Sequence, residues 1–289
     1  MRYLKSLNIE DLIFIDIEVC PIEEKLVEGS VLYDNWIYKL RNHRELLSTG
    51  KSYEELYTEN ASLYPEFSKI VCISIGKIKD DVLKLKSYYG DNEYELLKDF
   101  NKVMTAIVSS NKNTRLVGHF INGYDIPFIF NRSIINGIEP CSLVDVAHLK
   151  PWEVTSVDTH SLWKGTSLRS SNLMNICFSL GLGNPKQEMS GYDVGNIYYS
   201  EGGLEKIVAY CEADVYAVAN LVRKMRFESI IDVEYSPIDV KNVGTLEKLY
   251  NRDSKISEEE ENILKNASKG FTKKEQDIAK ELINIIKNK

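Results

Sequence analysis

Two acidic residues near the start of the chain, Asp16 and Glu18, have the residue type and spacing of a metal site. They lie in a segment rich in isoleucine, residues 12–19, whose apolar side chains on both faces predict a buried β-strand. Residues two apart on a strand share a face, so both carboxylates point the same way. Burying them unpaired would be strongly unfavourable, and a divalent cation that prefers oxygen ligands would resolve this. The alternative is that the strand end reaches solvent and both acids are exposed.

Two later segments carry acids that could complete such a site. Asp125 lies where a predicted strand gives way to a helix with Pro127 in its first turn, and by itself it could equally be a helix N-cap. Tyr210 and Asp214 are four residues apart in a long helical pattern and share its inward face. They could also form a hydrogen-bonded pair in the core.

The segments that must position these residues alternate between strand and helix patterns. Apolar runs and period-two alternation predict strands, and apolar residues at helical spacing predict helices. Their order, three strands, a helix, a strand and then helices, predicts an α/β domain with a mixed sheet. The predicted strands are residues 12–19, 69–78, 82–88, 115–120 and 157–160, and the predicted helices are residues 92–108, 126–135, 172–180 and 204–227.

The rest of the chain divides into an insertion and a tail. The insertion, about residues 20–66, is tyrosine-rich and polar, with short helices expected near 41–48 and 52–59. Two capping-box patterns predict short charged helices in residues 228–289, whose apolar stripe is more typical of packing than of partner docking. We therefore predict one domain over residues 1–227, followed by a helical C-terminal extension. The sequence does not indicate a role for the insertion or the extension.

Together the acidic segments resemble the DEDDy branch of the 3′–5′ exonucleases. The pattern is D-x-E on a first strand, tyrosine-aspartate opening a helix, and Y-x-x-x-D on a late helix, at spacings of about 110 and about 90 residues. The sequence is most similar to the proofreading exonuclease domains of family B DNA polymerases and to the predicted stand-alone exonucleases related to them. Residues 64–74 and 158–164 resemble the latter group. The resemblance covers roughly residues 10–226 and implies an RNase H-like, DnaQ-like fold.

The resemblance implies that Asp16, Glu18, Asp125 and Asp214 bind two divalent cations, Mg²⁺ or Mn²⁺. Two such ions can hold the attacking and leaving oxygens of an in-line phosphoryl displacement. Four carboxylates roughly neutralise the charge of the ions, which removes the like-charge problem of the first pair. Tyr210 is expected to orient the nucleophilic water, because the ordinary pKa of a tyrosine, about 10, makes it a poor general base.

Five residues are candidate substrate contacts. Asn122 is expected to contact the terminal nucleotide, although an Asn-Gly pair also forms turns, and relatives with a G-H-N pattern place an asparagine where Phe120 stands. Phe120 and Tyr124 could stack on unpaired bases or pack in the core. Lys164 and Lys186 could contact phosphates or be solvated loop lysines.

These features predict a metal-dependent 3′–5′ exonuclease that releases nucleoside monophosphates from the 3′ ends of single-stranded or frayed DNA. Single strands are expected because a terminal base must leave its partner to reach a recessed site. Two alternatives remain: an RNA 3′-trimming exonuclease of the same superfamily, and a non-catalytic DNA-end-binding module of a replication complex. A separate DNA polymerase or replication protein is an expected partner.

Composition and charge indicate which classes of protein are disfavoured and where in the cell the protein is expected. A net charge of −7 disfavours a protein that coats long nucleic acid non-specifically. The sequence has no apolar run long enough to cross a membrane and no signal-peptide pattern, so no membrane partner is expected. Five scattered cysteines without a C-x-x-C pair suit a reducing cytoplasm. We expect a cytoplasmic protein, acting in a host cell if a virus or phage encodes it.

Overall fold

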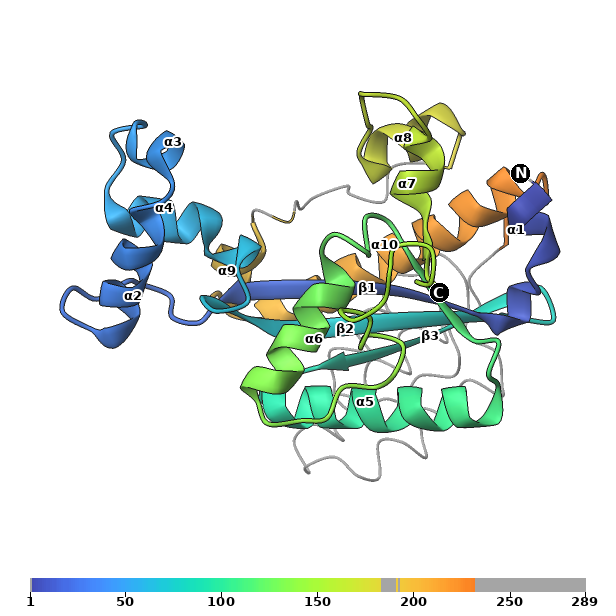
Figure 1. Cartoon of the computed structure of the whole chain (residues 1–289), viewed down its shortest axis with the longest axis horizontal. Coiled ribbons are helices and arrows are strands. Elements are labelled where there is room, and N and C mark those ends of the chain that lie inside the picture. The colour runs from blue at the N-terminus through green and yellow to red at the C-terminus, as the bar shows by residue number, and fades with distance from the viewer. Residues whose placement is uncertain (1, 183–190, 192, 232–289) are drawn as a thin grey trace, which may run out of the picture. The chain divides into compact units, whose positions relative to one another are not determined.

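The computed structural model describes residues 2–182, 191 and 193–231. Its centre is a five-stranded sheet with the order β3-β2-β1-β4-β5 (Figure 1). The first three strands of the chain pair antiparallel, whereas β4 pairs parallel with β1, and β5 with β4. The predicted mixed sheet is therefore confirmed. The strands are β1 (Leu12–Pro21), β2 (Ser68–Lys79), β3 (Val82–Tyr89), β4 (Arg115–Gly118) and β5 (Val157–Asp158).

The hairpin between β2 and β3 turns at Asp80 and Asp81, both with positive φ, 53° and 60°. In a two-residue hairpin loop of type I′, both residues have positive φ, which matches the twist of the strands, and aspartate tolerates that conformation better than most residues. The turn lies between the two predicted strands, residues 69–78 and 82–88.

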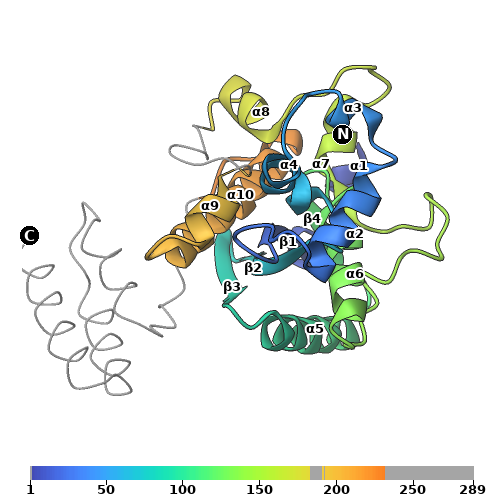
Figure 2. The ribbon, with the colours of Figure 1, turned by 90° about the vertical axis from the view of Figure 1, so that its left-hand side faces the viewer.

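Helices cover both faces of the sheet (Figure 2). On one face lie α5 (Glu93–Ser110) and α6 (Asp125–Ile135), and on the other α10 (Gly203–Met225) and α8 (Leu173–Ser179). These four helices lie where the sequence predicts them, with ends shifted by no more than two residues. Sheet and helices together form the RNase H-like exonuclease fold that the sequence predicts.

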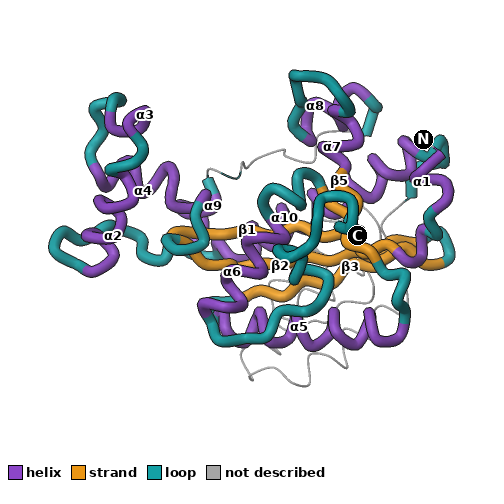
Figure 3. Tube along the Cα trace, viewed as in Figure 1, coloured by secondary structure: helices purple, strands orange, loops and turns teal. Residues whose placement is uncertain are grey.

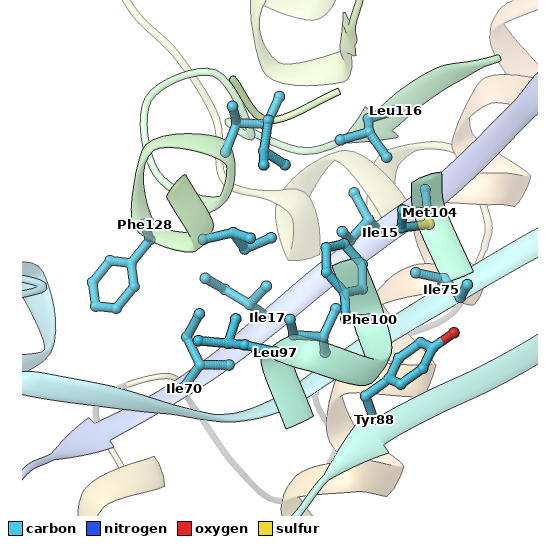
Figure 4. Close-up of a cluster of buried hydrophobic side chains, with 14 of the residues drawn as sticks. Ile15, Ile17, Ile70, Ile75, Tyr88, Leu97, Phe100, Met104, Leu116 and Phe128 are labelled. Atoms are coloured by element: carbon cyan, nitrogen blue, oxygen red, sulfur yellow. The ribbon is translucent and has the colours of Figure 1, made fainter. Parts of the chain in front are cut away.

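The alternation along β1 decides which side chains meet which helix layer. Ile15 and Ile17 pack with Phe100 of α5 and Phe128 of α6 in one core (Figure 4). Phe14 points the other way, into a second core built with α10 and α8. The face that Phe14 shares with the two acids of β1 is therefore the face covered by α10.

Figure 3 shows the remaining helices, which lie before β1 or in the segments that join the strands and helices described above. The insertion carries three helices and a short 3₁₀ helix. These are α2 (Val31–Leu40), α3 (Arg44–Leu47), α4 (Tyr53–Asn60) and η2 (Ala61–Leu63); the others are α1 (Arg2–Ser6), η1 (Ile9–Asp11), α7 (Thr159–Lys164) and α9 (Val194–Tyr198).

The insertion has a small core of its own, which explains a helix that the sequence analysis missed. Trp36 and Leu40, one turn apart on α2, are fully buried against Tyr57 and Phe67. Aromatic and β-branched residues are poor helix formers in isolation, so α2 depends on this packing rather than on propensity. The helix expected near 41–48 is the single turn of α3.

The predicted strand at residues 157–160 is wrong in its second half. Asp158 ends β5 and caps α7, since its carboxylate accepts hydrogen bonds from the main-chain N–H groups of His160 (3.0 Å) and Ser161 (3.3 Å). This N-cap turns the chain from strand to helix within one residue.

The predicted helices of the C-terminal extension fall in residues 232–289, outside the described part of the chain, so they remain a prediction together with the boundary at 227. Among the described helices, none combines the length and the apolar composition needed to cross a bilayer.

Candidate active site

The acids of β1 lie on the face that α10 covers, close to a bulge in the strand. The register between β1 and β2 shifts between Glu18 and Val19. Such bulges bend a strand and re-aim its side chains, and they are common beside active sites. Here the bulge follows directly after the D-x-E pair.

A cleft of about 870 Å³ opens above this end of β1. Five residues from three distant parts of the chain line it: Asp16, Glu18, Asp125, Tyr210 and Asp214. All but Asp16 are at least 93% buried. The structure thus brings together every residue predicted to be catalytic.

The neighbouring acids affect the pKa of Asp16. Burial raises its pKa well above the ordinary value, and the charges of Asp214, Glu18 and Asp125 raise it further. Within the described residues, its Oδ2 atom is buried and has no hydrogen-bond partner. A buried carboxylate oxygen that is crowded by other acids and has no hydrogen-bond partner is typical of a cation-binding site.

Asp125 is the first residue of α6, and the N-cap position before it belongs to Tyr124. Burial raises the pKa of Asp125 to about 7, with Asp158 and Asp214 adding to the increase. Main-chain N–H groups, including that of Ile17, act in the opposite direction. Asp125 is thus part of the acidic cluster and not the helix cap that its sequence context also allowed.

Tyr210 and Asp214 lie one turn apart on α10 and face β1. Burial raises the pKa of the Tyr210 hydroxyl above its ordinary value, and the charges of Asp214, Glu18 and Asp16 raise it further. The phenol therefore stays neutral at any physiological pH. It can donate or accept a hydrogen bond in the cleft, but it cannot act there as a phenolate base.

Cys211 is a neighbour of the acids that the sequence analysis did not identify. Candidate ligand atoms of Asp16, Glu18 and Cys211 lie within 4.8 Å of one another. The thiol is fully buried and donates a 3.3 Å hydrogen bond to the main-chain carbonyl of Asp16. Burial raises the pKa of Cys211, so it stays a neutral thiol that braces α10 against β1. The carboxylates remain the suitable ligands for a hard divalent ion.

The residues that line the cleft carry a strongly negative charge. Glu24 and Glu59 add to the four acids, and among the described residues that line the cleft there is no lysine or arginine. A phosphate group would be repelled from such a surface. Divalent cations held by the four central carboxylates would neutralise most of this charge.

The predicted substrate contacts divide into three groups. Phe120 and Tyr124 line the cleft. The side chain of Asn122 is exposed outside it and accepts a 2.5 Å hydrogen bond from the Ser156 hydroxyl, and Lys164, at the end of α7, is also not among the lining residues. Lys186 lies outside the described residues.

Parts of the cleft wall escaped the sequence analysis. Ser62 and Leu63 of η2 and Thr58 of α4 line it from the insertion, and Asn172 and Met174 line it from the region of α8. None of these residue types carries a chemical signature, so only the fold reveals them. The insertion is thus part of the cleft.

A family model described as a predicted 3′–5′ exonuclease related to the exonuclease domain of PolB matches residues 62–239. The chain belongs to this family. The stretch of this PolB-related exonuclease that matches contains Asp125, Tyr210 and Asp214, and it begins after Asp16 and Glu18.

The PolB-related exonuclease is also similar to the family B DNA polymerase of the hyperthermophilic archaeon Pyrobaculum calidifontis. The two share 12% sequence identity, with a TM-score of 0.47 over 93% of this chain and 26% of the polymerase. The chain therefore spans about a quarter of the polymerase's length. No match was found among curated proteins.

Proposed function

We propose that the protein is a metal-dependent exonuclease that removes nucleoside monophosphates from the 3′ end of single-stranded or frayed DNA. Family membership supports the 3′–5′ exonuclease activity. The observation that carries the rest is the convergence of Asp16, Glu18, Asp125 and Asp214, with Tyr210, on one cleft. These four acids would hold two divalent cations, Mg²⁺ or Mn²⁺.

The residues of the cleft suit divalent cations in two ways. Asp16 has a buried carboxylate oxygen without a hydrogen-bond partner among the described residues. The acids raise one another's pKa values, which a bound cation would reverse. When bound, such ions supply charge stabilisation to a phosphoryl displacement and a hydroxide near neutral pH.

The protein's own groups would orient the reaction. Tyr210, held neutral by its surroundings, would hydrogen-bond the attacking water and fix its direction. Phe120 and Tyr124 would contact bases of the strand end. Lys164 and Lys186 would contact phosphates farther along the strand, and Asn122 would contact the substrate outside the cleft.

The substrate would be an unpaired strand. A cleft of about 870 Å³ is in the range of pockets that hold small ligands, so it suits the end of one strand rather than a duplex. The 3′ ends would come from single-stranded DNA, and a separate DNA polymerase or replication protein could deliver them.

The test is a time course on 5′-labelled single-stranded DNA with Mg²⁺, with Mn²⁺ and with EDTA. We expect a ladder that shortens from the 3′ end with either ion and no cleavage with EDTA. A matched RNA oligonucleotide distinguishes the RNA-trimming alternative, which would degrade RNA faster. Binding of DNA ends without cleavage under any condition would instead favour the non-catalytic module. Asp214→Asn, purified in parallel, controls for contaminating nucleases.

A further inference from the structure

The loop between β4 and α6 holds a phenylalanine in an unusual backbone conformation. Phe120 has a φ of 67°, in the left-handed region. Glycine adopts this region freely and asparagine tolerates it, but a bulky aromatic residue there is an outlier. Strained residues persist only where their surroundings hold them in place, and they concentrate at functional sites.

Asp158 supplies the restraint. Its carboxylate, 5% exposed, accepts hydrogen bonds from four main-chain N–H groups, two in the loop and two at the start of α7. Its Oδ1 atom binds the N–H groups of Phe120 and His160 at the same distance, 3.0 Å. The other two donors are Asn122 (3.4 Å, to Oδ2) and Ser161 (3.3 Å, to Oδ1). One side chain therefore fixes the loop relative to the helix.

The Phe120 ring is fixed by the same arrangement, yet it stays accessible. It packs edge-on against the His160 ring, with a centroid distance of 5.1 Å and an interplanar angle of 75°. It also lies against Gly123, where an added Cβ would come within 2.4 Å of a ring atom. Even so, Phe120 is 48% exposed and lines the cleft. A residue strained only to fill the core would have buried its ring.

We propose that Phe120 is a stacking platform for an unpaired base of the substrate strand, and that Asp158 is the positioning residue that holds it there. This rests on the proposed function, because the strand must place its 3′ end among the cleft acids. Stacking accepts every base, since each has a π-face. Affinity should therefore depend little on sequence, and blunt duplex ends, whose bases already stack on their neighbours, should bind weakly.

Two substitutions of Phe120 separate a platform from a packing residue. Phe120→Asn relaxes the backbone and removes the ring, whereas Phe120→Tyr keeps both the ring and the strain. Binding is measured by the anisotropy of a fluorescein-labelled single strand with Ca²⁺ in place of Mg²⁺, and the melting temperature alongside. We expect Phe120→Asn to melt higher than the wild type and to bind on the order of 10-fold more weakly, as for the loss of one stacked base. Phe120→Tyr should bind within about threefold of the wild type.

Substitutions of Asp158 test whether it acts through Phe120. Asp158→Ala should lose about the same 10-fold in affinity, because the ring is no longer held. Asp158→Asn keeps an oxygen at the position that accepts three of the four bonds and should bind nearly as the wild type does. In a Phe120→Asn background, Asp158→Ala should cost no further affinity. An equal loss in both backgrounds would show that Asp158 acts elsewhere.

Unchanged binding by Phe120→Asn, or a lower melting temperature, refutes the platform even if Asp158→Ala fails to fold. So does a wild-type protein that does not bind single strands. The proposed function fails separately: protein that binds single strands through Phe120 without cleaving them overturns the exonuclease and leaves the platform. If the wild-type protein cleaves DNA and Phe120→Asn binds with wild-type affinity, the platform is refuted and the exonuclease remains.

Discussion

The Tyr124 hydroxyl donates a 2.7 Å hydrogen bond to the main-chain carbonyl of Ser62. The bond joins the residue before Asp125 to the 3₁₀ helix η2 of the insertion, and both partners line the cleft. Burial raises the pKa of Tyr124 above its ordinary value, so the donor stays protonated. One wall of the cleft is thereby attached to the segment that carries Asp125.

Tyr124→Phe removes this bond and leaves the Ser62 carbonyl without its donor. A hydrogen bond of this kind contributes about 1 kcal/mol, and a domain of this size should melt roughly 2–4 °C lower. Because the insertion is less firmly held, we expect KM for single-stranded DNA to rise more than kcat falls. Tyr38→Phe, at an exposed position on α2, is the matched control and should change neither quantity. A fall in kcat alone would contradict the attachment role.

Asp16→Asn removes the charge that three neighbouring acids repel. We expect no detectable hydrolysis, since a predicted metal ligand is lost, together with a higher melting temperature in EDTA. Burial and the charges of the neighbouring acids raise the pKa of Asp16, so its ionised form destabilises the metal-free protein and its removal should stabilise it. Asp34→Asn, at an exposed acid of α2, should alter neither. Divalent-dependent cleavage by clean Asp16→Asn protein would refute the site.

The sequence was sufficient for the sheet, because apolar runs and period-two alternation marked its strands, and β1 is apolar on both faces except at Asp16 and Glu18, which is typical of a central strand. The later acids were identifiable for a similar reason. Asp125 follows a strand, and Tyr210 and Asp214 share a helix face, so local geometry already restricted where they could point. Their convergence needed the resemblance to a known family.

What the sequence could not give depends on contacts between distant residues. Helix α2 forms because Trp36 packs against Tyr57 and Phe67, and no local sequence pattern predicts that contact. The left-handed Phe120 depends on a carboxylate 38 residues away, that of Asp158 at the end of β5. Asn122 had the residue type of a substrate contact, but its side-chain oxygen accepts a hydrogen bond from Ser156, and it is not among the residues that line the cleft.

The raised pKa of Asp125, about 7, makes metal-free stability depend on pH. The folded state binds a proton that the unfolded chain, with a pKa near 3.8, releases earlier, so the free energy of unfolding falls as pH rises from about 4 to 7. Cation binding needs the ionised form, so affinity should increase over the same range. Melting temperatures in EDTA and in excess Mn²⁺, from pH 5 to 8, should therefore diverge as pH rises. Asp125→Asn should make the EDTA curve less steep, and a flat wild-type curve would contradict the assignment.

A buried ion pair anchors the end of the insertion. Arg132 of α6 binds both carboxylate oxygens of Glu93 and donates a 2.8 Å hydrogen bond to the Pro65 carbonyl. Arg132→Ala leaves the buried Glu93 carboxylate without its cationic partner. The free energy of unfolding, measured by heat or urea, should fall by about 3–5 kcal/mol. Lys51→Ala breaks the ion pair with Glu59, whose side chains are about half exposed, and should cost at most about 1 kcal/mol. Equal losses of stability in the two variants would mean that burial does not determine how much the Arg132–Glu93 pair contributes.

Tyr210→Phe tests whether the tyrosine orients water or supports the fold. Because its surroundings keep the phenol neutral, we expect kcat to fall about 10–100-fold without any change in the shape of the pH–rate profile. Mn²⁺ affinity and melting temperature should stay close to wild type. Tyr88→Phe is the matched control: Tyr88 is also 7% exposed, lies in the core on the other side of the sheet, and its hydroxyl has no hydrogen-bond partner among the described residues. Loss of Mn²⁺ affinity in Tyr210→Phe, with Tyr88→Phe unaffected, would instead make the tyrosine a structural support of the acids.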